Sequence, residues 1–540
     1  MWRKSRLPLF VFGLCLFLLA LSLWITGRGP AVRGIQPRIA EPGDTLVISG
    51  NNFGDAPGRV SIAGVVPVVS AYIAWTPRSI SVRIPDDASS GLVYVITEKG
   101  QSEGVLFTNR KDIPVVLRGA QDARPYITAV SPARSAVVSL VTLSGKNFGY
   151  NRDDSLVFFT WAPVSDAVRV DPKSRYIAAS PEAFDYEGWS NGEITVRVPT
   201  GAGSGAIMVR TAQGESNTVS FELDQSTGRR IFRDKVSYTL VSSIDVRNTS
   251  RKDGGSLYLW IPRIQESPCQ RNIQIISREP SPEIENYNGL MLFCFKDPKR
   301  GVPYRIEQAF SIDCYTVESR IEPARVPVSY NTERPLYKAY TSSNEFTPAA
   351  DPDIAAAAGA NGGREANPYI RARRLYDFVL SRLTYSAEKK YTGALEGLRT
   401  RTGDAYTYAT LYVALLRSAG IPARTLGGYL VGEPDSARPH FWTELYLPNF
   451  GWMPADPALG DKGGPEGFPL PASAADYFFG SISNRHVVFS RGLLQAKMVS
   501  PQGRALHQED IHSLQTIYTE AVGTLESYSG QWNDLRIIER

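Results

Sequence analysis

The sequence predicts a multidomain protein in which an N-terminal transmembrane helix precedes all-β sandwiches and then an α+β domain. Three observations lead to this prediction: an apolar run near the N-terminus, a set of short motifs that occurs twice, and a helix-then-strand pattern in the last third of the chain. The length of 540 residues leaves room for about three to five domains.

The apolar run covers residues 7–26 and follows Arg3, Lys4 and Arg6. A helix of this length reaches about 30 Å, the thickness of a bilayer core. Because basic flanks stay in the cytoplasm, the rest of the chain is expected outside it, in the periplasm or beyond the cell. The run is longer than the apolar part of a cleaved signal peptide, which favours a retained signal-anchor over residues 1–30. We therefore expect a single-pass protein of the cell membrane with an exported body.

The charge balance argues against one class of partner. Basic residues exceed acidic ones by 59 to 54, and the five surplus charges lie in residues 1–34. The body of the protein is therefore neutral, which is a poor electrostatic footprint for nucleic acid.

Four cysteines are also too few for a disulfide scaffold.

A duplicated module follows the membrane segment. One pair of matching segments is displaced by 95 residues and a second pair by 114. Two constant offsets indicate one module in two copies, the second with about nineteen extra residues that we expect to enlarge a loop. The matching pairs are Gly50–Gly54 with Gly145–Gly149, and Ile80–Pro85 with Ile194–Pro199.

Each copy alternates β-branched stretches with Gly, Pro and Asn turns, as is typical of an antiparallel sandwich. The Ser131-Pro132 opening, the Ser-Gly-x-Asn-Phe-Gly segment and the x-Val-Arg-x-Pro strand resemble IPT/TIG domains. We place the two copies at residues 31–110 and 118–224. The resemblance implies immunoglobulin-like sandwiches that serve as spacers or that bind a protein or a glycan.

Residues 230–345 are expected to form a further β-sandwich, with strands at 236–246, 256–261 and 304–315. A linker is predicted at residues 351–363, where Asp-Pro-Asp and Gly-Gly flank a run of alanines. The sandwich segment holds Cys269, Cys294 and Cys314, so at most one intramolecular disulfide forms and one thiol is left over.

A helix-then-strand pattern occupies residues 365–495. Helices are predicted over 368–383 and from Ala405 to the stop signals Gly420 and Pro422. Strands follow, and the alternation over 440–447 places His440, Trp442, Glu444 and Tyr446 on one face.

Five motifs occur in order in this segment: Gly403-Asp404, Arg417–Arg424, His440-x-Trp442-x-Glu444, Gly451-Trp452-x-Pro454-x-Asp456 and Gly480–Gly492. Their order resembles the transglutaminase-like superfamily, whose core is papain-like. The family implies a Cys-His-Asp triad, with the cysteine at a helix N-terminus and the other two residues on neighbouring strands. His440 maps onto the histidine and Asp456 onto the aspartate, whereas Ala405 stands where the family has its cysteine.

No nearby residue is expected to replace the missing thiol. Thr407 is expected to point away from the histidine, and Tyr406 and Tyr408 have high ordinary pKa values without evident activation. Asp404 is a base suited to a different chemistry. We therefore expect a pseudoenzyme with a vestigial triad.

Two interpretations of the remaining residues stay open. In the first, a groove around Asp404, Ala405, His440, Trp442 and Asp456 binds a peptide or a glutamine-like side chain without cleaving it. In the second, His440 and Asp456 are a structural pair inherited with the fold. Trp442 and Trp452 are expected in the core.

Neither a metal nor a cofactor is predicted, because the other histidines show no grouping with cysteines. Those histidines are His486, His507 and His512. Apolar residues at helical spacing over 510–528 predict an amphipathic C-terminal helix within 505–540.

The predicted function is binding or scaffolding at the cell envelope, with an envelope or surface protein, a peptide or a glycan as partner. One alternative is an active transglutaminase or peptidase that transfers acyl groups with a nucleophile other than cysteine. A further alternative is a structural spacer.

Overall fold

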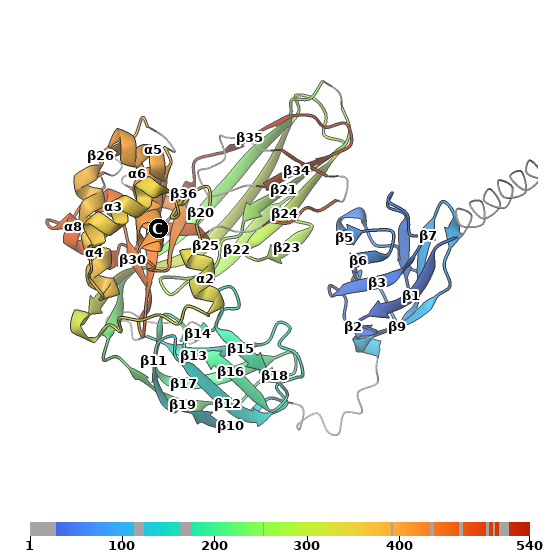
Figure 1. Cartoon of the computed structure of the whole chain (residues 1–540), viewed down its shortest axis with the longest axis horizontal. Coiled ribbons are helices and arrows are strands. Elements are labelled where there is room, and N and C mark those ends of the chain that lie inside the picture. Colours follow the sequence, from blue (N-terminus) through green and yellow to red (C-terminus); the bar gives the residue numbers. More distant parts are fainter. Residues whose placement is uncertain are drawn as a thin grey trace, which may run out of the picture.

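The structure is a computed structural model that describes residues 29–112, 124–162, 175–251, 253–389, 392–432, 437–463, 468–492, 496–500, 503–506 and 518–540. Figure 1 shows two β-sandwiches, a third sandwich with long strands, and a helical part. No helix in these ranges is both long enough and apolar enough to cross a membrane. The predicted membrane segment at 7–26 lies outside the described residues.

The first sandwich consists of two sheets. One sheet has the order β1-β3-β6-β5 and the other β2-β9-β7-β4, with β8 paired to β7. Its strands are β1 (Ala31–Gln36), β2 (Ile39–Ala40), β3 (Thr45–Asn51), β4 (Arg59–Ile62), β5 (Tyr72–Trp75), β6 (Ser79–Arg83), β7 (Gly91–Thr97), β8 (Gly100–Gln101) and β9 (Val105–Asn109), with short 3₁₀ turns at Val69–Ala71 and Arg110–Asp112.

The second sandwich repeats this topology, which confirms the duplication. Its sheets have the orders β10-β12-β16-β15 and β11-β19-β17-β13-β14, with β18 paired to β17. Strand β14 has no counterpart in the first copy. It lies between Tyr150 and Trp189, where the extra residues of the second copy are expected. The strands are β10 (Tyr126–Ser131), β11 (Arg134–Ala136), β12 (Leu140–Lys146), β13 (Leu156–Trp161), β14 (Tyr176–Ala178), β15 (Tyr186–Trp189), β16 (Glu193–Arg197), β17 (Ala202–Thr211), β18 (Gly214–Glu215) and β19 (Val219–Asp224).

Packing explains why glycine precedes phenylalanine by three residues in the repeated Gly-x-x-Phe segment. A Cβ on Gly50 would lie 2.4 Å from the ring of Phe53, so only glycine lets this buried ring fold back over the strand. The Phe53 carbonyl accepts a hydrogen bond from the indole of Trp75 at 3.3 Å. The second copy builds the same cluster from Gly145, Phe148 and Trp189.

A third sandwich has unusually long strands, and it confirms the strands predicted at 236–246, 256–261 and 304–315. Its sheets have the orders β22-β25-β20-β35 and β23-β24-β21-β34-β33, with β31 and β36 paired to β25 and β20. The strands are β20 (Gly228–Asn248), β21 (Ser256–Pro262), β22 (Gln270–Glu279), β23 (Ile284–Tyr287), β24 (Leu290–Lys296), β25 (Pro303–Ile321), β31 (Ser481–Ile482), β33 (Arg504–Leu506), β34 (Tyr518–Val522), β35 (Tyr528–Trp532) and β36 (Arg536–Glu539).

The predicted C-terminal helix is wrong in the part of 505–540 that the structure describes. Strands β34, β35 and β36 run beside strands of the third sandwich, as the red arrows among green ones in Figure 1 show. Ala521 pairs with Leu257, and Ala521 and Leu525 are buried in the sandwich core. Pairing with the open edges of β20 and β21 thus overrides the helical spacing of the apolar residues. Along the sequence, the helical part therefore lies between the first and the last strands of this sandwich.

The helical part packs its helices against an antiparallel sheet of order β30-β29-β28-β32. The helices predicted at 368–383 and from Ala405 are confirmed as α4 and α6. The elements are a 3₁₀ turn at Pro323–Arg325, α2 (Pro335–Thr341), α3 (Pro352–Gly362), α4 (Pro368–Arg382), β26 (Thr384–Tyr385), α5 (Ala394–Thr400), β27 (Thr402–Gly403), α6 (Ala405–Ser418), β28 (Ala423–Val431), β29 (Ala437–Leu447), β30 (Gly451–Ala455), α7 (Pro457–Gly460), α8 (Ala474–Tyr477) and β32 (His486–Arg491).

The linker predicted at 351–363 is instead helix α3. Asp351 caps it by accepting a hydrogen bond from the backbone of Asp353 at 2.9 Å, and Pro352 takes the first helical position. Gly363 ends it with a φ of +61°. Ile354 and Ala358 are buried against α4 and α6. The turn-like residues are therefore helix caps, and the alanines between them form the helix.

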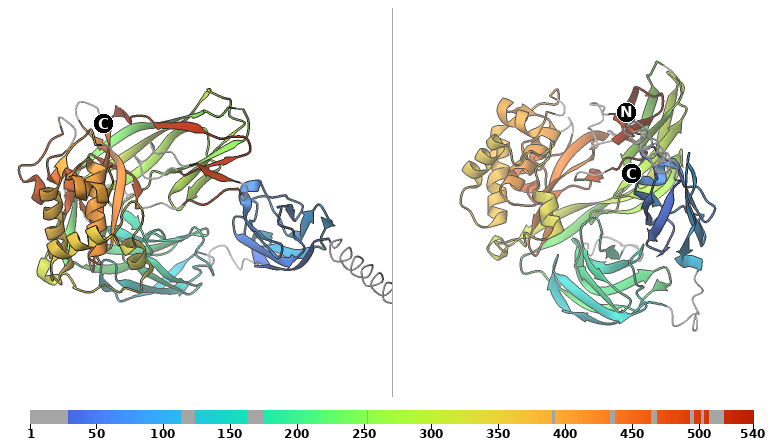
Figure 2. Two further views of the ribbon diagram at one scale, coloured as in Figure 1. Left: turned by 45° about the horizontal axis from the view of Figure 1, so that its top comes forward. Right: turned by 45° about the vertical axis from the view of Figure 1, so that its right-hand side comes forward.

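The second sandwich, the third sandwich and the sheet of the helical part share one core. Trp452 illustrates the contact: its backbone N–H donates to Thr200 at 3.3 Å, and its carbonyl accepts from Arg230 at 2.5 Å. Figure 2 shows the second sandwich lying against the helical part. Buried residues of this shared core include Phe159, Trp161, Phe232, Tyr315, Leu426, Trp442, Tyr446 and Trp452.

Asp185 provides a pH test of this contact region. It is 6% exposed, and burial raises its pKa to about 7. The hydrogen bond from the Ser180 backbone N–H and, to a smaller extent, nearby arginines partly offset this. Between pH 4 and 7 the folded state keeps a proton that the unfolded state releases, so stability falls as the pH rises through this window. Between pH 5 and 8, Asp185 should lower the free energy of unfolding of the wild type by about 3 kcal/mol, and Asp185→Asn should abolish this decrease.

The measurement is the thermal unfolding midpoint at pH 5, 6.5 and 8. The matched control is Glu182→Gln, which changes an exposed carboxylate in the same loop. Equal pH slopes in the wild type and in Asp185→Asn would contradict the assignment.

Candidate functional site

The structure brings His440 and Asp456 together. His440 lies on β29, and Asp456 directly follows β30, the neighbouring strand. The Nε2 atom of His440 lies 2.7 Å from Oδ2 of Asp456. His440 is 2% exposed and Asp456 is fully buried. The two strand residues of the predicted triad are therefore paired as the resemblance implies.

A second histidine, His486, shares the same carboxylate oxygen. Its Nε2 lies 3.1 Å from Oδ2 of Asp456, and its ring is also buried. His486 opens β32, which pairs with β28 on the side opposite to β29. The sequence contains His486 in a motif of the resemblance, but neither spacing nor composition indicates that it meets Asp456. Only the strand order shows this.

Further hydrogen bonds fix the carboxylate and the second ring. The backbone N–H of Leu459 donates to Oδ1 of Asp456 at 3.0 Å, since Asp456 also caps helix α7. The Nδ1 atom of His486 lies 3.1 Å from Oγ and 3.2 Å from the carbonyl oxygen of Ser483. Both oxygens of Asp456 and both nitrogens of His486 therefore have partners.

The charges in this cluster follow from burial and hydrogen bonding. Burial alone would raise the pKa of Asp456, but His440 and His486 outweigh it and hold that pKa well below its usual range. Burial lowers the pKa of His486. At neutral pH the cluster thus contains an ionised carboxylate and a neutral His486 ring.

Trp442 and Trp452 are buried, as predicted for core residues. The indole of Trp442 stacks on His440 with ring centroids 6.1 Å apart, and it meets His486 edge-on at 5.1 Å. It therefore holds both imidazoles in place.

Glu444 explains the last position of the His-x-Trp-x-Glu motif. Its Oε2 accepts hydrogen bonds from Nε and Nη2 of Arg424 at 2.9 and 2.7 Å, and its Oε1 accepts from Arg491 at 3.2 Å. Arg424 also stacks on Trp452 at 3.9 Å. These buried charges connect β28, β29 and β32, the three strands that carry or flank the site.

Ala405 is the first residue of α6 and is 6% exposed. Asp404 caps this helix, with its Oδ1 accepting from the Thr407 backbone at 3.1 Å. The ring of Tyr406 meets Phe441 at 5.1 Å, which places the start of α6 beside the strand segment that holds His440. A methyl group therefore stands at the N-terminus of α6.

Neighbouring hydroxyl groups are engaged elsewhere. The Thr407 hydroxyl donates to the carbonyl of Thr392, and the Tyr408 hydroxyl donates to Asp461. Burial raises the pKa of both Tyr406 and Tyr408.

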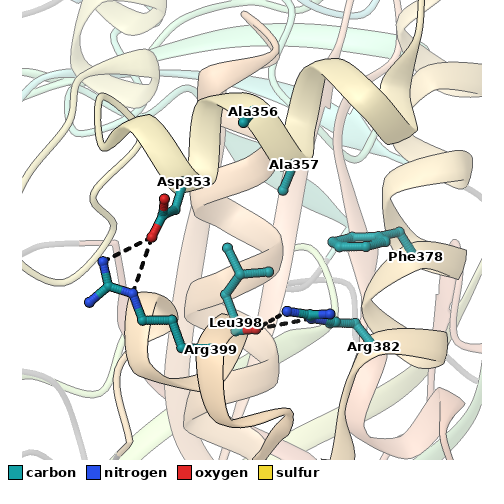
Figure 3. A pocket seen from close by; sticks show the side chains of 7 residues that line it. All are labelled: Asp353, Ala356, Ala357, Phe378, Arg382, Leu398 and Arg399. Carbon is teal, nitrogen blue, oxygen red and sulfur yellow. Dashed lines mark hydrogen bonds and ion pairs between the residues drawn. The ribbon is translucent and has the colours of Figure 1, made fainter.

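The five residues of the predicted groove differ in exposure. Of its five residues, Asp404 is half-buried, whereas Ala405, His440, Trp442 and Asp456 are buried. A hollow of about 310 Å³ lies elsewhere, between α3, α4 and α5. Figure 3 shows its charged side chains already paired, with Arg399 on Asp353 and Arg382 on the Leu398 carbonyl.

Three cysteines are free thiols: Cys269, Cys294 and Cys314. The single disulfide that the sequence allowed is thus not formed among them. Burial raises the pKa of each, to about 11 for Cys294. None of them belongs to the segment around Ala405.

The fold of residues 356–457 and the His-Asp pair define a transglutaminase-like domain. The model of the Transglutaminase-like superfamily matches residues 356–457.

Sequence relatives match short stretches only. The chain is 36% identical over 74 residues to the uncharacterized protein YebA of Bacillus subtilis, and 39% identical over 67 residues to the protein-glutamine gamma-glutamyltransferase of Pseudomonas aeruginosa. Each match covers 11% of this chain and spans 10% of the relative's length. Among solved structures, a candidate cysteine protease of Cytophaga hutchinsonii aligns with 58% of this chain and 94% of its own, at 15% identity and a TM-score of 0.40.

Proposed function

We propose that this protein is an exported, membrane-tethered envelope protein whose transglutaminase-like domain serves in scaffolding or binding and does not catalyse. The observation that carries the proposal is Ala405 at the N-terminus of α6, where the triad needs a thiolate. The engaged hydroxyl of Thr407 and the raised pKa values of Tyr406 and Tyr408 support it.

The packing of the domain favours scaffolding in particular. The sheet face that carries Trp442 and Trp452 is part of the core shared with the second and third sandwiches. In this proposal the two N-terminal sandwiches are IPT/TIG domains that hold the body away from the membrane segment at residues 7–26. An envelope or surface protein, a peptide or a glycan is the partner.

The test is a transamidation and hydrolysis assay with a glutamine-containing peptide and an amine donor. We expect no turnover above buffer for the wild type or for His440→Ala. Turnover by the wild type that His440→Ala abolishes would overturn the proposal in favour of acyl transfer by another nucleophile. Ala405→Cys, alone and combined with His440→Ala, is the matched pair that reports whether residue 405 is the nucleophile position. Carbonate extraction of membranes from the same cells checks the tether, since release of the chain would contradict it.

A further inference from the structure

We propose that His440, His486 and Asp456 form a binding site for one divalent transition-metal ion of the Zn²⁺ class. The three side chains come from β29, from β32 and from the residue after β30. Their ligand atoms all lie within 4.8 Å of one another. Two imidazoles and one carboxylate are a donor set that suits Zn²⁺ and Fe²⁺.

The distances leave a short step to coordination. Both Nε2 atoms point at the same carboxylate oxygen, at 2.7 Å for His440 and 3.1 Å for His486. Ligand atoms around one tetrahedral ion lie about 3.3 Å apart, because each is about 2.0–2.2 Å from the metal. To seat an ion, the Nε2–Oδ2 contact would lengthen by about 0.6 Å for His440 and by about 0.2 Å for His486. Ligand atoms of the cluster that lie up to 4.8 Å apart would have to move closer together.

Outer hydrogen bonds already orient the ligands. Ser483 holds Nδ1 of His486, and the Leu459 N–H holds Oδ1 of Asp456. Such partners direct the remaining nitrogen and oxygen toward a metal in known sites. Stacking by Trp442 fixes the plane of His440.

The contrast with a thiol triad strengthens the inference. In that triad the carboxylate orients a single histidine, which serves the thiol. Here Ala405 supplies no thiol, and Asp456 has two imidazoles. All three ligands are buried, so a bound ion would be shielded from water and would stabilise the fold.

The test uses the full chain after removal of metals with a chelator, and Zn²⁺ and Co²⁺ as probes. We expect one bound equivalent, a rise of about 5 °C in the unfolding midpoint with excess Zn²⁺, and Co²⁺ absorption bands without a thiolate charge-transfer band. The last feature separates this site from binding at Cys269, Cys294 or Cys314.

His486→Gln should weaken Zn²⁺ binding at least 100-fold, whereas His507→Gln, the matched control outside the described residues, should leave it unchanged. Absence of binding by the wild type at about 1 mM Zn²⁺, equal binding by His486→Gln, or a thiolate band with Co²⁺ would overturn the proposal. Because the Co²⁺ spectrum is recorded on the wild type, the test stands even if His486→Gln does not fold.

Discussion

Replacing Glu444 by glutamine is expected to destabilise the transglutaminase-like domain by about 3–5 kcal/mol. The substitution keeps the shape of the side chain but leaves Arg424, which is 5% exposed, without its buried counter-charge. Arg491 loses its carboxylate partner at the same time. The measurement is the thermal unfolding midpoint, which should fall by about 10 °C for a domain of this size.

An exposed pair provides the matched control. Glu333→Gln removes a carboxylate that pairs with Lys338 at 2.7 Å, with side chains 83% and 60% exposed. Solvent screens such exposed pairs and they add little to stability, so the unfolding midpoint of this variant should barely move. Similar shifts of the unfolding midpoint in the two variants would show that the ion pairs of Glu444 do not stabilise the domain through their burial.

Gly428→Ala is expected to cost about 3 kcal/mol, at the upper end of overpacking effects. Gly428 pairs with His440 on β29, and β28 shifts its register against β32 at this point. A Cβ here would lie 2.0 Å from the Val487 carbonyl oxygen, which is backbone and has no free rotation. The methyl group would push β32, and with it His486, away from β28.

Gly359→Ala is the control, because a Cβ at that position of α3 meets nothing within 4 Å. It should be neutral or slightly stabilising, since alanine favours a helix more than glycine does. Unfolding midpoints of both variants test the contrast. A midpoint for Gly428→Ala within about 2 °C of the wild type would mean that the strands separate easily at this point.

The sequence predicts the parts of the site that local motifs encode. Helix α6 begins at Ala405 because Asp404 is a good N-cap, and the alternation on β29 places His440, Trp442 and Glu444 on one face. The duplication of the sandwich could also be predicted from the sequence, because Gly50 and Phe53 recur in the second copy with their packing partners. In each case the information lies within a few residues of the feature.

Features that depend on distant pairing could not be predicted in this way. His486 reaches Asp456 only because β28 lies between β29 and β32, a strand order that no local pattern contains. Strand β34 takes its conformation from β21, about 260 residues earlier. The prediction of a linker at the position of helix α3 was wrong for a different reason. Asp351, Pro352 and Gly363 are residue types that occur both in turns and in helix caps.

The transglutaminase-like domain is inserted in the sequence between strands of the third sandwich, and this order has a consequence for folding during synthesis. Strand β20 emerges early, yet Thr239 meets its partner Glu539 only after 300 further residues have followed. Until then the edges of β20 and β21 are unpaired and open to other strands. The sandwich closes last, so the growing chain depends on the early folding of its other domains, or on chaperones, to keep these edges apart.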